Sequence, residues 1–210
     1  MSTEANELVE NFDEAAFEQT AKVNSYFTAS RFLVASSAML QGGLVFAFFY
    51  LRSVNSSGLW RLPHQIPSII LGSLIAVAAI AAAGVNLGGL SRLRKNVRLD
   101  WQVSTGIAVF LELFATGMQI WQLTRIPFFP GSSGYASVFV GWAVINVVFL
   151  LGAAYWVETL LARSLRVGSE TGNTSDSDPS FTASVEAGAF FLNFMAVTEI
   201  VIFVLFYIVK

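Results

Sequence analysis

The chain contains no cysteine, and its 210 residues include a single histidine, His64. Without cysteine it builds no disulfide, thiolate zinc site or iron–sulfur cluster. One histidine is too few for bis-histidine heme ligation or for a histidine copper cluster within one subunit. We therefore expect no catalytic, cofactor-binding or metal site within this chain, and any redox metal that it serves belongs to a partner.

Charge is also scarce, since only 12% of the residues are charged and 55% are hydrophobic. A soluble domain of this length needs more polar surface than that. Five apolar segments are long enough to cross about 30 Å of hydrocarbon as helices. The expected spans are 31–51, 66–90, 101–123, 136–161 and 185–209.

Residues 31–210 are therefore predicted to form an all-α transmembrane bundle of five helices. Lipid offers the backbone no hydrogen-bond partners, and the segments are too long and too uniformly apolar for barrel strands. Residues 1–30 are expected to form an acidic tail. Apolar side chains recur there at helical spacing, which indicates either an amphipathic helix that docks on a basic partner or a partly ordered, solvated tail.

The basic residues predict the orientation of the bundle. Eight of the twelve lie on one side of the predicted topology, in the amino-terminal flank, the second loop and the fourth loop. By the positive-inside rule the amino terminus is cytoplasmic and the carboxyl terminus lies outside.

Two acidic residues, Glu112 and Glu199, lie deep within predicted spans. An intramembrane carboxylate costs at least about 2.5 kcal/mol at mid-bilayer, so each must face protein, water or a polar partner. Either they belong to a proton-accessible or partner-binding surface, or they are neutralised by protonation or by hydrogen bonds inside the bundle. The candidate amide partners are Gln119, Gln122, Asn146 and Asn193.

Small and basic residues supply two further sets of candidates. Gly84 and Gly88, four residues apart, favour close helix packing, either with a partner or within the bundle. Four arginines near predicted span ends are candidates for binding lipid headgroups, although topology alone accounts for their presence. They are Arg52, Arg92, Arg94 and Arg98. The sequence has no nucleic-acid-binding patch.

Several segments resemble subunit III of cytochrome c and quinol oxidases. Ala35–Met39 and Phe46–Arg52 are similar to A-S-E-x-M…F-F-A-Y-F-Y-L-R, and Gly117–Gln122 is similar to G-F-Q-x-Y-E. Tyr135–Phe139 resembles Y-G-S-x-F, and Glu186–Tyr207 resembles the closing E-A-x-x-x-Y-W-H-F-V-D helix. The segments follow one another in the family's order.

The chain departs from the family at nearly every ionisable position. Neutral residues stand where the family has an acid or a histidine: Ser37, Gln122, Asn146, Phe149, Asn193 and Ala196. The intramembrane acids Glu112 and Glu199 are newly placed by comparison, which indicates a divergent branch.

The resemblance implies a non-catalytic accessory subunit of a heme-copper terminal oxidase in aerobic respiration, in a prokaryotic-type inner membrane. Such a subunit packs on the catalytic subunit beside other respiratory subunits, binds phospholipids, and supports proton uptake and stability. Heme and copper are then expected in the partner subunits. The resemblance also implies the short, five-helix form of the family.

Two alternatives stay open. The first is an accessory subunit of a nitric oxide reductase-type or atypical heme-copper complex. The second is a small membrane transporter or channel, which is disfavoured because five spans do not form two equal halves and no internal repeat is evident. An enzyme that works alone is disfavoured further, because no nucleophile, metal or cofactor site converges.

Overall fold

The computed structural model describes residues 14–55, 60–170 and 179–209. The described residues form five long α-helices and one short π-helix, and contain no strand. The elements are α2 (Glu14–Val54), α3 (Ile69–Leu93), α4 (Arg98–Arg125), α5 (Gly134–Glu170), α6 (Pro179–Phe203) and η1 (Val204–Ile208). Five helices are long and apolar enough to cross a membrane, which confirms the predicted all-α, multi-pass bundle.

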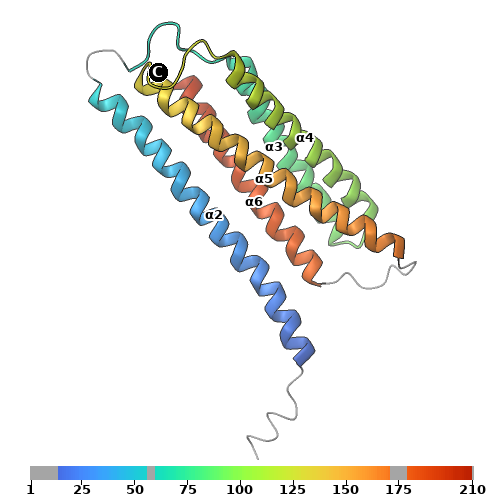
Figure 1. The fold of residues 1–210 in the computed structure, drawn as a ribbon. Helices are drawn as coiled ribbons and strands as arrows, with labels where there is room; N and C mark the ends of the chain where they lie inside the picture. The colour runs from blue at the N-terminus through green and yellow to red at the C-terminus, as the bar shows by residue number, and fades with distance from the viewer. Residues whose placement is uncertain (1–13, 56–59, 171–178, 210) are drawn as a thin grey trace, which may run out of the picture.

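Three of the helices, α2, α4 and α5, are longer than their predicted spans. α2 has 41 residues and α5 has 37, so at 1.5 Å per residue α2 is about 60 Å long, roughly twice the hydrocarbon thickness. α2 continues unbroken from Glu14 through the predicted boundary at residue 31, and its first turns extend beyond the bundle (Figure 1). The earlier part of the predicted tail, with Leu8 and Phe12, lies outside the described residues.

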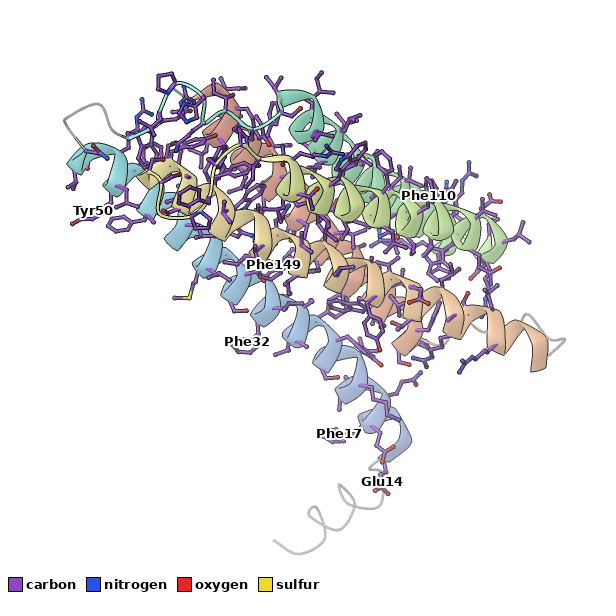
Figure 2. The ribbon with its side chains drawn as sticks, turned by 45° about the horizontal axis from the view of Figure 1, so that its top comes forward. Glu14, Phe17, Phe32, Tyr50, Phe110 and Phe149 are labelled. Atoms are coloured by element: carbon purple, nitrogen blue, oxygen red, sulfur yellow. The ribbon has the colours of Figure 1, made fainter. Side chains whose placement is uncertain are left out.

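α6 is the central helix and α2 the peripheral one. α6 packs against α3, α2 and α5, whereas α2 packs mainly on α6 and α5 (Figure 1). In their apolar windows 56% of the α6 residues are buried but only 17% of the α2 residues. Figure 2 shows Phe32 and Tyr50 along α2, and both side chains are largely exposed. In a membrane, such apolar surface faces lipid or another subunit.

The two ends of the bundle differ in chemistry. The start of α2, the α3–α4 turn and the end of α5 lie at the same end (Figure 1), which we call the basic end. There the Arg94 guanidinium donates to the Glu186 carboxylate at 2.7 and 2.9 Å, and Arg98 donates to the Ser164 carbonyl at 2.6 Å. These bonds tie the α3–α4 turn to α6 and α4 to α5.

The opposite end holds a set of packed rings that we call the aromatic cluster. Its members are Phe48, Trp60, Phe128, Tyr135, Phe139, Trp142 and Phe206. Phe206 lies at its centre, with ring centroids 5.3 to 5.8 Å from Phe48, Phe139, Trp142 and Tyr135. The Tyr135 hydroxyl also donates to the Phe206 carbonyl at 2.9 Å. Close aromatic contacts of this kind stabilise helix packing where no hydrophobic effect operates.

Candidate functional site: a buried polar chain

α4 is polar on its inner face and apolar on its outer face. Its buried residues include Thr105, Glu112, Thr116, Gln119 and Gln122. Phe110, 67% exposed, lies on the outside (Figure 2). The buried positions repeat every three or four residues, so the helical period brings them onto one face. The polar residues thereby avoid lipid, as they must in a membrane.

Side-chain hydrogen bonds link this face of α4 to the neighbouring helices. Gln122 Nε2 donates to the Ser68 carbonyl before α3 at 3.2 Å and to the Tyr207 hydroxyl in η1 at 2.6 Å. Gln119 Nε2 donates to Gln122 Oε1 at 3.2 Å, and Asn146 Nδ2 of α5 donates to Gln119 Oε1 at 3.3 Å.

Two carboxyl groups lie deep in the bundle beside the end of this chain of bonds. Asn146 neighbours Glu199 of α6. Glu112 lies close enough to Glu199 for their charges to interact. The two side chains are only 1% and 2% exposed. We call Gln122, Tyr207, Gln119 and Asn146 the buried polar chain, which begins at the carbonyl of the exposed Ser68. We call Glu112 with Glu199 the carboxyl pair.

Several polar atoms at this site have no hydrogen-bond partner. They are both carboxyl oxygens of Glu112, Oε1 of Glu199, Oδ1 of Asn146 and Nε1 of Trp142. A buried polar atom without a partner costs about 1–3 kcal/mol. The carboxyl pair is therefore not explained by the packing of the bundle alone, because packing gains nothing from these atoms.

A cavity of about 10 Å³ lies between the carboxyl pair and the aromatic end. Glu199, Gln119 and Trp142 line it from three helices, and Gly72 and Tyr207 line it nearer the start of α3 and the end of η1. A Cβ added at Gly72 would overlap the Tyr207 ring, so glycine at this position makes room for tyrosine. The cavity is near the lower size limit for one water molecule.

The structure brings together five of the six predicted polar residues. Glu112, Glu199, Gln119, Gln122 and Asn146 all belong to the polar chain or the carboxyl pair. Asn193 is only partly buried. Six residues of α-helix turn by about 240°, so Asn193 lies on a different face of α6 from Glu199.

Gly84 and Gly88 lie on the outside of α3. Both are exposed, and no atom lies within 4 Å of a Cβ added at either position. The described helices therefore do not pack on this pair, which differs from the interpretation that the motif packs within the bundle. Close packing occurs instead at Gly72 and Gly89. An interface between the Gly84–Gly88 pair and a partner stays a prediction.

The four candidate arginines divide between the two ends. Arg52 lies in the last turn of α2 at the aromatic end. Arg92 lies 4.0 Å from Asp100, while Arg94 and Arg98 bond to α6 and α5 as described above. Arg94 and Arg98 therefore stabilise the basic end, and lipid binding by the four stays a prediction.

Sequence reasoning missed Tyr207, Trp142 and Ser68 as members of the site. Tyr207 and Trp142 were indistinguishable from the many other aromatic residues of an apolar chain. The i, i+3 spacing of Gln119 and Gln122 shows that they share one face of α4, but nothing in the sequence selects the hydroxyl that Gln122 contacts.

Chemically, the site offers two carboxyl groups and several amides in a low-dielectric interior. No group of three or more histidine, cysteine, aspartate or glutamate side chains converges among the described residues. Paired carboxyl groups and amides suit proton binding or hydrogen bonding to water. No protein-family model matches the chain, and no curated protein is significantly similar to it.

Proposed function

We propose that this protein is a subunit III-like accessory subunit of a heme-copper terminal oxidase in a prokaryotic-type inner membrane. In this role it packs on the catalytic subunit, binds phospholipids on its apolar faces, and supports proton uptake and the stability of the complex. Heme and copper belong to the partner subunits.

The observation that carries the proposal is the order of the family-like segments along the chain, together with their location. They fall on α2, α4, the start of α5, and α6 with η1. Many of their residues are interior ones, including Phe48, Gln119, Tyr135 and Phe206. Interior residues determine how the helices pack, so the likeness concerns the scaffold of the bundle.

The exposed apolar side of α2 fits a subunit that packs against others. Phe32, Met39 and Phe46 are largely exposed and recur every seven residues, so they form one stripe along the helix. In the proposed complex, the catalytic subunit or phospholipid covers this stripe. A nitric oxide reductase-type complex would use the same surface. The identity of the co-purifying catalytic subunit distinguishes that complex from a terminal oxidase.

The test is a pull-down of the tagged chain in a gentle detergent, with the untagged chain as the control. Visible redox spectra detect heme, and mass spectrometry identifies the partners. We expect heme bands and a large many-helix catalytic subunit to co-purify. Recovery of the chain colourless and alone contradicts the proposal.

A matched pair of variants then locates the interface. Met39→Ala changes the exposed stripe on α2, and Phe110→Ala changes the exposed side of α4. If α2 faces the catalytic subunit, less heme co-purifies with Met39→Ala than with Phe110→Ala.

One observation favours the transporter or channel as a second candidate. The carboxyl pair resembles a coupling site, since intramembrane acids commonly mark proton or ion pathways. Ion-uptake assays in proteoliposomes test it directly, and they are the next experiment if the chain purifies alone.

A further inference from the structure

The carboxyl pair lacks hydrogen-bond donors. Its unpartnered atoms are three carboxyl oxygens, two on Glu112 and one on Glu199, and Oδ1 of the neighbouring Asn146 is unpartnered as well. The nearby amide groups donate elsewhere, because Gln119 donates to Gln122 and Asn146 donates to Gln119. The missing partner of the carboxyl oxygens is therefore a bound proton, water or a cation.

The described residues supply no counterion for the pair. Residues 32–51, 69–91, 99–124, 134–162 and 179–209, which make up most of the helices, contain no lysine, arginine or histidine. A partner's basic side chain cannot reach two carboxyl groups that are almost fully buried within this subunit. Two negative charges without a counterion in such a site cost several kcal/mol each.

Few other titratable groups lie near the pair. Glu112 belongs to α4 and Glu199 to α6, and Tyr207 of η1 lines the cavity together with Glu199. α5 contributes Tyr135, which bonds to the Phe206 carbonyl, and the largely exposed Tyr155. α3 has no titratable side chain before Arg92, and α2 has none from Phe32 to Phe49. Proton binding is thus the available route to neutralise the pair.

The cavity, which Glu199 lines, offers the pair access to water. Trp142 lines it as well, and its Nε1–H is an unpartnered donor while Glu199 Oε1 is an unpartnered acceptor. A buried water needs two to four polar partners. Tyr207 and Gly72 line the cavity toward the aromatic end. Toward the basic end, alanines, leucines and valines of α3, α5 and α6 fill the interior around Ala79, Leu150 and Val157.

We propose that Glu112 and Glu199 bind at least one proton in the middle of the bundle and exchange it with the aqueous phase at the aromatic end through water in this cavity. A hydronium ion in the cavity water gives its proton to one carboxylate oxygen, so that one hydronium O–H bond breaks, one carboxyl O–H bond forms and a neutral water molecule is left. The new carboxyl O–H donates to one of the unpartnered oxygens. The proposal does not depend on the oxidase assignment, since the site lies wholly within this chain.

The test is infrared spectroscopy of the purified full-length chain, with any partners that accompany it, in lipid nanodiscs at neutral pH. A protonated carboxyl gives a carbonyl band that shifts when H₂O is replaced by D₂O. Difference spectra between wild type and Glu112→Gln or Glu199→Gln isolate the pair. Glu158→Gln is the matched control, because Glu158 is exposed.

We expect the band to disappear in at least one of the two buried variants and to persist in Glu158→Gln. If both glutamine variants retain the full band, or if wild type lacks it, the proposal is wrong. If a variant does not fold, the wild-type chain labelled with ¹³C-carboxyl glutamate replaces it. A band from a protonated glutamate must shift to lower frequency with this label, and a band that does not shift contradicts the proposal.

Two further measurements test the ligand and the route. If replacing choline chloride with sodium chloride abolishes the band, a monovalent cation occupies the site and the proton proposal is overturned. Tyr207→Phe keeps its ring and Trp142→Phe keeps a smaller aromatic ring, and both variants remove a polar hydrogen near the cavity. We expect them to slow deuterium exchange of the band several-fold, and unchanged exchange in both variants excludes this route.

Discussion

Glu199 of the carboxyl pair precedes Phe206, the centre of the aromatic cluster, by seven residues, which is about two helical turns. The two regions nevertheless differ in how well their side chains are partnered. In the aromatic cluster the rings pack tightly around Phe206, and the Tyr135 hydroxyl has a partner. In the carboxyl pair, three of the four carboxyl oxygens have none. The aromatic cluster raises the free energy of unfolding, whereas the unpartnered carboxyl oxygens lower it. Because the bundle keeps these destabilising groups, we infer that they have a role other than packing.

Phe206→Ala should produce the largest effect, because it empties the centre of the aromatic cluster. Loss of a buried phenylalanine side chain costs about 3–5 kcal/mol, measured as the free energy of unfolding in mixed micelles by circular dichroism. Phe110→Ala, on the exposed side of α4, should change it little. Similar losses in both variants would show that the cluster is not the main source of stability.

Glu112→Leu should have the opposite effect to Phe206→Ala and should stabilise the bundle. Both oxygens of this carboxyl lack partners, so an apolar side chain of similar size should raise the free energy of unfolding by about 1–3 kcal/mol. The same unfolding assay measures the change. A loss of stability would mean that the carboxyl contributes to packing after all.

Gln122→Leu removes the donor that links α4 to the Ser68 carbonyl and the Tyr207 hydroxyl. Interhelical hydrogen bonds in membranes contribute about 0.6 kcal/mol each on average, so we expect a loss of about 1 kcal/mol. The double variant Gln122→Leu/Tyr207→Phe should lose less than the sum of the two single variants, because the two side chains share one bond.

The ion pair between Arg94 and Glu186 should contribute least. It lies at the basic end with its guanidinium more than half exposed, and exposed ion pairs are typically worth about 0.2–1 kcal/mol. A double-mutant cycle with Arg94→Ala and Glu186→Ala measures the coupling. The coupling should shrink as salt is raised, and a value insensitive to salt would indicate a more buried pair.

Sequence reasoning identified the helices well and the packing poorly. Apolar runs located all five spans, but the extension of α2 to Glu14 was not evident, because its first turns are polar and hydropathy does not measure helix length. Gly84 and Gly88 have the right spacing for close packing, yet face outward. Spacing fixes which residues share a face of a helix, but not which face meets a neighbour.

The sequence by itself determined that this protein lies in a membrane as five helices, because long apolar runs without charge have no other stable environment. It also determined that Glu112 and Glu199 must avoid lipid. Only the tertiary structure decided that the two acids from α4 and α6 lie near each other, that Asn146 neighbours Glu199 and that Asn193 lies on another face of α6. Such meetings depend on how each helix is rotated and shifted against its neighbours, which the packing of all the helices sets together.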